Sequence, residues 1–180
     1  MTEQWAHSSA IEMVSAGIMN CTGNEGVPLF RPDTDVTREE FVVMVLKALG
    51  FSDSSSAYVS VFADDADIYP EMKGYIALAY SKGYISGIKS EGKLYFNPNE
   101  SITMSEAAVI VSNMIGYAEP KITPVFADAD DIPAWSSKAI ESLHTLGILE
   151  LPDMVSGACD TVTRGDMAKL LNKTMFVIDK

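Results

Sequence analysis

The sequence predicts an all-α fold made of three helix-loop-helix units, packed together as one structural domain. Three observations lead to this prediction: landmark residues that repeat along the 180-residue chain, a threonine and an acid at the start of three apolar helical patterns, and the size of the units. A unit of about 60 residues buries only about 60% of the surface that its unfolded chain exposes, which is marginal for independent stability. We therefore expect the units 1–57, 58–119 and 120–180 to share one core, with one capped helix from each unit meeting near a pseudo-threefold axis.

The repeat is visible in residues that return at matching spacings. Val61–Asp64 returns as Val125–Asp128, 64 residues later, and each segment is followed by Asp-Ile and an apolar stretch. Each unit then has a glycine and a threonine, the glycines being Gly17, Gly83 and Gly147 and the threonines Thr37, Thr103 and Thr163. The glycine-to-threonine separations are 20, 20 and 16 residues, so the third unit has lost four residues from an internal loop. A fixed period of this kind indicates a repeat architecture.

The first helix of each unit ends at the repeated glycine. In the third unit, apolar residues at helical spacing precede Gly147, namely Trp135, Ile140, Leu143 and Leu146. Ile76, Ala79 and Tyr80 repeat this pattern before Gly83, and the glycine of the first unit follows Trp5 by the 12 residues that separate Trp135 from Gly147. A glycine here can adopt the positive φ of a helix C-cap. The first unit lacks the Phe-x-Asp segment that opens the others, so we expect that Met1 is not the natural start and that the chain is a piece of a longer protein.

The second helix of each unit begins with a capping box. The pairs, each three residues apart, are Thr37 and Glu40, Thr103 and Glu106, and Thr163 and Asp166. In each pair the threonine oxygen can accept an early backbone N–H, and the acid can reach back to the N–H of the cap. Amphipathic runs follow, and Gly50 and Gly116 end the first two. These six residues are predicted to be mainly structural.

Composition and charge exclude several classes of function. The net charge of −12 and the pI near 4.4 argue against nucleic-acid binding and against an anionic membrane surface. No apolar run approaches the length that spans a bilayer, and residues 1–5 have no signal-peptide character, which fits either a cytosolic protein or a piece of an exported one. Cys21 and Cys159 form no metal or disulfide motif, and His7 and His144 have no nearby catalytic partner. We therefore expect no cofactor, no metal and no enzyme activity.

The landmark residues resemble the S-layer homology (SLH) module. The first copy has Trp5-Ala6, Gly17-Ile18, Gly23, Phe30-Arg31-Pro32 and Val36-Thr37-Arg38-Glu39-Glu40-Phe41, close to the family's Thr-Arg-Ala-Glu. The second has Phe62-Ala63-Asp64, Gly83, Gly87, Phe96-Asn97-Pro98 and Ile102-Thr103-Met104-Ser105-Glu106. The third has Phe126-Ala127-Asp128, Trp135, Gly147-Ile148 and Val162-Thr163-Arg164-Gly165-Asp166. Three copies in the same order cover essentially the whole chain.

The resemblance implies a pseudo-trimer with a central three-helix bundle and grooves between neighbouring units. It implies an exported module at the bacterial cell surface, acting as a monomer, whose grooves bind a secondary cell-wall polymer or another wall glycan, often through a pyruvylated amino sugar. The residues implied in ligand contact are Arg38, Arg164, Trp5, Trp135, Gly17, Gly83, Gly147 and Lys73. The chemistry is suitable, because a guanidinium pairs with the carboxylate of a pyruvyl ketal through two parallel bonds and an indole packs on a sugar face.

This sequence departs from the family pattern mainly in its second and third units. Met104 stands where the second unit should have arginine, and Glu71 stands where it should have tryptophan. Ser156 and Ala158 replace the phenylalanine and the proline of the third unit. Our hypothesis is that the groove of Arg38 is the principal site and that of Arg164 the second.

Each functional interpretation has a structural alternative. Arg38 and Arg164 can pair with acids of the protein instead of a ligand, and their neighbours Glu39 and Asp166 are the acids expected to compete for them. Trp5 and Trp135 can be buried against a neighbouring unit. The acidic stretches 64–67 and 128–131 suggest calcium but lack the EF-hand spacing, so capping and solvation are preferred. For the whole chain, the alternative to wall anchoring is a degenerate SLH fold that serves as a protein-interaction or spacer domain of a larger surface protein.

Overall fold

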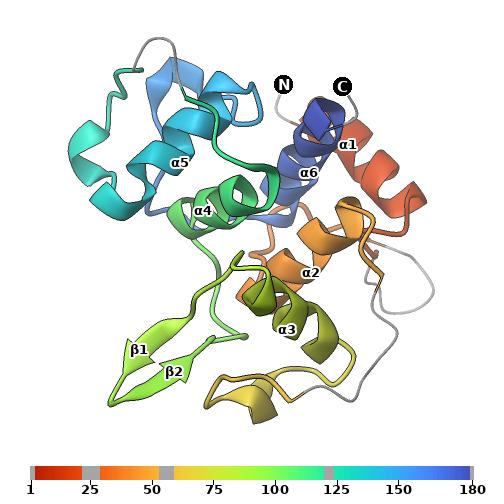
Figure 1. Cartoon of the computed structure of the whole chain (residues 1–180). Coiled ribbons are helices and arrows are strands. Elements are labelled where there is room, and N and C mark those ends of the chain that lie inside the picture. Colours follow the sequence, from red (N-terminus) through yellow and green to blue (C-terminus); the bar gives the residue numbers. More distant parts are fainter. Residues whose placement is uncertain (1–2, 22–28, 53–58, 120–123, 179–180) are drawn as a thin grey trace.

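The computed structural model describes residues 3–21, 29–52, 59–119 and 124–178, without the side chains of residues 3–7. The described residues are mostly helical (Figure 1), as predicted. Their α-helices are α1 (Glu3–Ser15), α2 (Arg38–Ala48), α3 (Lys73–Ser81), α4 (Met104–Ile115), α5 (Ala134–Thr145) and α6 (Arg164–Ile178). Short 3₁₀ turns lie at Asp65–Asp67, Ala129–Asp131 and Pro152–Met154. No helix in these ranges is both long and apolar enough to cross a membrane.

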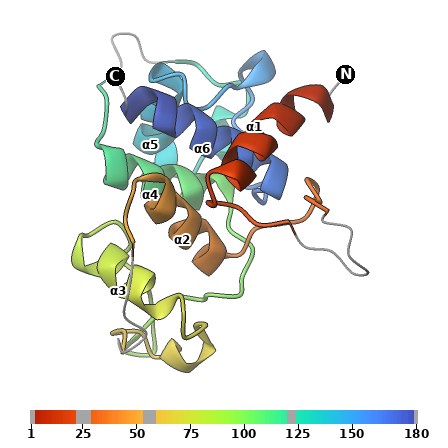
Figure 2. The ribbon, with the colours of Figure 1, turned by 90° about the vertical axis from the view of Figure 1, so that its right-hand side faces the viewer.

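The helices pack in pairs that do not follow the order of the chain. Helix α2 packs on α3, α4 on α5, and α6 on α1, so each capped helix pairs with the first helix of another unit. The third pair packs the first described helix against the last, and Figure 2 shows α1 lying across α6. The units are therefore joined by their main helix contacts, which explains how segments of this size share one core.

A ring of three backbone hydrogen bonds joins the segments that precede α2, α4 and α6. Val36 N–H donates to Val162 O at 2.9 Å, Val162 N–H to Ile102 O at 2.9 Å, and Ile102 N–H to Val36 O at 3.0 Å. The side chains of all three residues are fully buried. Each segment thus donates a backbone hydrogen bond to one of the other two segments and accepts one from the other.

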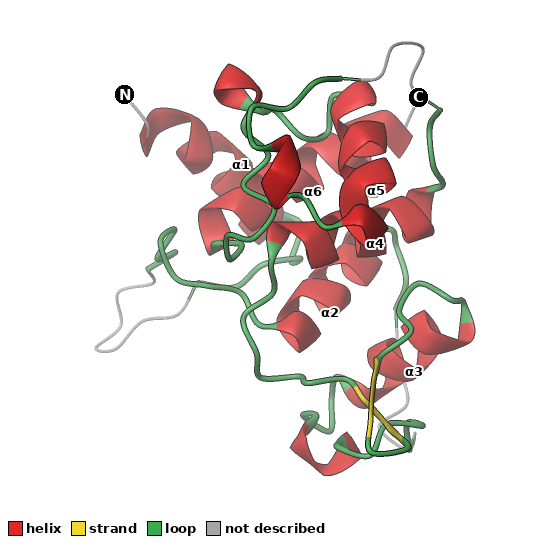
Figure 3. Cartoon of the chain, turned by 90° about the vertical axis from the view of Figure 1, so that its left-hand side faces the viewer, coloured by secondary structure: helices red, strands yellow, loops and turns green. Residues whose placement is uncertain are grey.

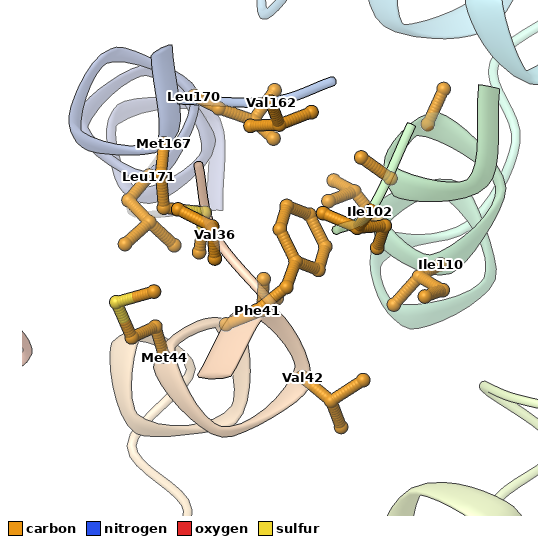
Figure 4. Packing of buried hydrophobic residues seen from close by; sticks show 14 of the residues in the cluster. Val36, Phe41, Val42, Met44, Ile102, Ile110, Val162, Met167, Leu170 and Leu171 are labelled. Carbon is orange, nitrogen blue, oxygen red and sulfur yellow. The ribbon is translucent and has the colours of Figure 1, made fainter. Parts of the chain in front are cut away.

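The core lies where the capped helices converge on this ring. The residue four positions after each cap threonine is fully buried, and these residues are Phe41, Ala107 and Met167. Figure 4 shows the ring of Phe41 directed between α4 and α6, with Ile102 and Val162 beside it. The large aromatic side chain of α2 therefore occupies the space between the other two capped helices.

Among the described residues, a short β-hairpin was not predicted. A two-stranded antiparallel hairpin, β1 (Ile88–Ser90) and β2 (Lys93–Tyr95), projects beside α3 (Figure 3). The two residues of its turn, Glu91 and Gly92, both have positive φ, at 48° and 76°. This is the backbone of the tight turns that suit the twist of a hairpin. The strands are only three residues long, too short for the alternating pattern by which a strand is predicted.

Candidate functional site

The two residues after each cap threonine donate their backbone N–H groups to a loop of another unit, in the same way at the start of α2, α4 and α6. Arg38 N–H donates to Glu100 O, Met104 N–H to Asp160 O, and Arg164 N–H to Thr34 O, at 2.8–2.9 Å. The N–H of the following residue donates to Pro98, Ala158 or Pro32. The start of each capped helix therefore lies against the loop of another unit, and the side chain at this position is directed by backbone geometry that does not depend on its type.

The side chain of Arg38 contacts Phe96 and Glu106 of the second unit. Its Nε donates to Phe96 O at 2.9 Å, its Nη1 lies 2.7 Å from Oε1 of Glu106, and its guanidinium stacks on the Phe96 ring with 5.5 Å from Cζ to the ring centre. Arg38 is only 6% exposed. A guanidinium shielded from water in this way interacts with a carboxylate more strongly than one on the open surface.

The Arg38 groove is a cavity of about 370 Å³ beside this arginine. Its lining residues come from four parts of the chain and are Arg38 of α2, Gly83–Ile88 after α3, Glu106, Val109, Ile110 and Asn113 of α4, and Trp135 of α5. Three of the predicted site residues, Arg38, Gly83 and Trp135, are thus brought together. Trp135 is 61% exposed, so the alternative that this indole is buried against a neighbouring unit is wrong.

The loop of the Arg38 groove depends on a glycine. Gly87 has φ of +73°, and a Cβ there would lie 2.6 Å from the Phe62 ring and 3.0 Å from Tyr95 O. Any side chain would therefore clash with the Phe62 ring and with β2, so the loop could not keep this position. Gly87 belongs to the sequence motif, and its role here is close packing of the backbone.

Arg164 makes the corresponding contacts with the first unit. Its Nε donates to Phe30 O at 2.9 Å, its Nη2 donates to Asn20 O, and its guanidinium stacks on the Phe30 ring at 5.1 Å. Phe30 and Phe96 both stand seven residues before the cap threonine of their unit. The sequence motif contains these rings, but nothing in the sequence assigned them to the arginine of another unit.

The Met104 groove is the third place of this kind and is the larger cavity, about 860 Å³. Its lining residues are Ser9 of α1, Met104 of α4, Ile148–Pro152 after α5, Val162, and Asp166, Lys169, Leu170 and Lys173 of α6. The position that holds arginine elsewhere is methionine here, and Ser156 replaces the aromatic ring. This groove is lined largely by apolar side chains.

The predicted capping residues lie at the helix starts. Both bonds of a capping box join Thr37 with Glu40 and Thr103 with Glu106. At α6, Asp166 N–H donates to Thr163 Oγ1 at 3.2 Å, and Thr163 N–H donates to Asp166 Oδ2 at 3.3 Å. Glu106 also pairs with Arg38 through its other oxygen, so it has a role in the groove that the capping pattern did not reveal.

The predicted glycines end the first helices. Gly17, Gly83 and Gly147 follow α1, α3 and α5 with φ of 70°, 74° and 72°. The next residue after each donates its N–H to a carbonyl in the last turn, as in a Schellman motif. Nothing lies within 4 Å of the place of a Cβ at any of them, so the positive φ and not crowding requires glycine. Of the three, Gly83 lines a described groove.

Two other predicted ligand residues have different surroundings. Lys73 forms an ion pair with Asp65 of its own unit, and both side chains are 18% exposed. Desolvation raises the pKa of Asp65, but the hydrogen bonds from Lys73 and Ser60 outweigh it and lower the pKa overall. Trp5 belongs to α1, but its side chain lies outside the described residues, as does that of His7.

The acids expected to compete for the arginines have other partners. Glu39 is 1% exposed and accepts the Tyr69 N–H at 3.2 Å, and Arg38 pairs instead with Glu106 from another unit. Asp166 caps α6 and lies 3.5 Å from Lys169. The sequence suggested that acids next to the arginines in the chain would pair with them, whereas Arg38 pairs with Glu106, which the packing of another unit brings to it.

The acidic stretches hold loops in place. Asp64 accepts the N–H groups of Phe96 and Asn97, and Asp128 accepts those of Ser156 and Gly157, at 2.7–3.2 Å. Neither aspartate caps the short 3₁₀ turn that follows it, so the capping interpretation of these stretches was wrong. In the described part of the chain, no three His, Cys, Asp or Glu side chains are grouped so as to hold a metal ion.

Comparison with known proteins gives one family. The family model for the S-layer homology domain matches residues 1–42 and 61–108. The chain is 31% identical over 127 residues to the surface-layer 125 kDa protein of Lysinibacillus sphaericus, covering 68% of this chain and 10% of that protein. It is 30% identical to an endoglucanase of Bacillus sp. KSM-635, covering 67% and 12%. It is 26% identical to a cell surface protein of Thermoanaerobacter kivui, covering 95% and 20%. The chain thus spans about a tenth to a fifth of the length of these relatives.

Proposed function

The chain belongs to the S-layer homology family, and from this premise we propose that it anchors a surface protein by holding an anionic cell-wall glycan in the Arg38 groove. SLH domains are non-catalytic modules that anchor surface proteins to the cell wall, and the module lies outside the cell, at the cell surface. The observation that carries the proposal is the meeting of Arg38, Gly83 and Trp135, from three units, around one groove.

The groove has the parts that a carboxylated sugar requires. The contacts of Arg38 with Phe96 and Glu106 engage Nε and Nη1, and the guanidinium carries five N–H donors in all. The helix start at Arg38 adds the positive end of the α2 dipole. The exposed Trp135 indole offers a flat face to a sugar ring. We assign the carboxylate to Arg38, the sugar face to Trp135, and the backbone approach to Gly83 and its loop.

We also propose that the chain is three SLH repeats, 1–57, 58–119 and 120–180, arranged as a monomeric pseudo-trimer around α2, α4 and α6. The ring of bonds among Val36, Ile102 and Val162 supports this arrangement. So do the pairing of α6 with α1 and the equal contacts of Arg38 and Arg164 with Phe96 and Phe30. Arg164 is then the cation of a second groove, with Gly17 and Asn20 in its loop.

The test is co-sedimentation with purified cell-wall sacculi, with and without their secondary polymer. Arg38→Ala is expected to weaken polymer-dependent binding at least tenfold, because a charge-assisted hydrogen bond contributes about 1.5–3 kcal/mol. Arg38→Met is the matched variant, since Met104 shows that the fold accepts methionine in this position. Binding of either folded variant as tight as that of the parent would exclude Arg38. A folded parent that ignores the polymer would favour a protein-interaction or spacer domain.

A further inference from the structure

The Met104 groove has a wall that corresponds, position by position, to that of the Arg38 groove. In α4 the wall residues stand three, six, seven and ten places after the cap threonine, and the same four places of α6 line the Met104 groove. Glu106 therefore corresponds to Asp166, and Ile110 to Leu170. The two grooves are the same construction with different side chains.

The difference along this wall is one of charge. Val109 and Asn113 of α4 are replaced by Lys169 and Lys173 of α6. The groove that has methionine in the arginine position thus has two basic side chains on its opposite wall. The positive charge is not lost from this groove and stands on a different element.

Each groove pairs its basic residue with the capping acid of its wall. Glu106 lies 2.7 Å from Arg38, and Asp166 lies 3.5 Å from Lys169. Lys173 is paired with Glu150, which lies in the loop on the other side of the groove. An arriving carboxylate therefore meets cations that are already paired with internal acids in both grooves, and in the Met104 groove Glu150 acts on Lys169 as well as on Lys173.

The apolar surroundings favour an anion at Lys169. The rest of the lining includes Ile148, Leu149, Leu151, Pro152 and Val162. Burial lowers the pKa of Lys169, and the nearby Asp166 offsets this in part. A charged amine that has lost water in a partly apolar site gains from an added negative partner.

We infer that the Met104 groove is a separate anion-binding site, in which Lys169 and Lys173 take a carboxylated sugar in place of an arginine. An ammonium is a compact charge without the planar fork of a guanidinium, so this site binds the carboxylate with less geometric selectivity than Arg38 does. The inference rests on the proposed function, because it assigns a second part of the same wall glycan to a second groove.

The test uses the whole chain and two probes, a methyl glycoside of a pyruvylated amino sugar and the same glycoside without the pyruvyl group. The background is Arg38→Met with Arg164→Met, which leaves no groove arginine. We expect this variant to bind the pyruvylated glycoside more weakly than the parent does, but still more tightly than it binds the glycoside without the pyruvyl group. In NMR spectra, this binding is expected to shift the backbone amide signals of Leu149–Leu151. Adding Lys169→Met and Lys173→Met is expected to weaken this remaining binding at least tenfold.

The matched control adds Lys89→Met and Lys93→Met, which remove two exposed lysines of the hairpin and leave the Met104 groove intact. Its affinity is expected to stay within twofold of the background, so that net charge alone is excluded. The inference is overturned if the folded background variant binds nothing, or if removing Lys169 and Lys173 changes binding no more than the control. In both cases the parent still binds through its arginines and the proposed function stands. A parent that binds neither this glycoside nor the secondary polymer of the sacculi removes both.

Discussion

The Arg38 groove and the Met104 groove share a backbone and differ in the source of their charge. In both, the residue after the cap threonine is fixed by an N–H bond to the loop of another unit, from Arg38 to Glu100 and from Met104 to Asp160. The first groove receives its cation across the unit boundary, whereas the second has Lys169 and Lys173 on its own helix wall. The comparison teaches that the backbone specifies the shape of a groove without specifying which charged side chains line it, so the side chains of one groove can change while those of the other are kept.

The largest expected effect would remove both grooves together. Phe41 is fully buried where α2 meets the other capped helices (Figure 4). Phe41→Ala is expected to lower the free energy of unfolding by about 3–5 kcal/mol, because a large cavity opens in the shared core. Urea denaturation measures this loss.

A matched comparison is Val109→Ala, at the half-buried wall of the Arg38 groove. This variant is expected to lose much less stability than Phe41→Ala. If the two variants cost the same, or if Phe41→Ala disturbs only one groove, the grooves do not stand on a common core.

The prediction of intermediate size is for a substitution that makes the two grooves more alike. Met104→Arg is expected to tighten binding of a pyruvylated glycoside roughly tenfold or more, because the N–H bond to Asp160 holds the residue as Arg38 is held and a charge-assisted hydrogen bond contributes about 1.5–3 kcal/mol. Titration calorimetry in an Arg38→Met background measures the gain. Met104→Leu is the control, since it changes the shape without adding charge. An arginine variant that binds no better than the leucine variant would show that backbone placement is not sufficient and that the missing ring at Ser156 matters.

The sequence predicted the local elements that form the two grooves better than it predicted how these elements pack against one another. The helices, the capping threonines and the C-cap glycines follow from local periodicity and from backbone chemistry, which the chain carries within about a dozen residues. The pairing of Arg38 with Glu106 joins residues of different units, and no local pattern contains it. The groove lysines were missed for the same reason, because Lys169 and Lys173 are ordinary polar positions of an amphipathic helix until the loop at Ile148–Pro152 is placed opposite them.

The smallest effect concerns the residue that follows each of these positions, Glu39 beside Arg38 and Ser105 beside Met104. The Ser105 hydroxyl pairs with that of Ser136 at 3.0 Å, which leaves no charge in the contact. Glu39 is equally buried but carries a carboxylate, whose Oε2 accepts the Tyr69 N–H. Burial raises the pKa of Glu39, the Tyr69 bond lowers it in part, and Glu40 and Glu71 raise it further.

This raised pKa means that the folded protein binds the Glu39 proton more tightly than the unfolded chain does. The free energy of unfolding must then fall as the pH rises from the ordinary pKa of glutamate through the raised one, and the deficit persists at neutral pH. Glu39→Gln keeps a carbonyl oxygen for the Tyr69 N–H and removes the buried charge. We therefore expect a small gain in stability at pH 7 that disappears near pH 4, measured as melting temperature against pH. Glu40→Gln is the control, because glutamine also completes a capping box and Glu40 is less buried. If the difference between Glu39→Gln and the parent is the same at both pH values, the Glu39 carboxylate costs the fold nothing. The first and second units then differ at this position in hydrogen bonding and not in the energy of a buried charge.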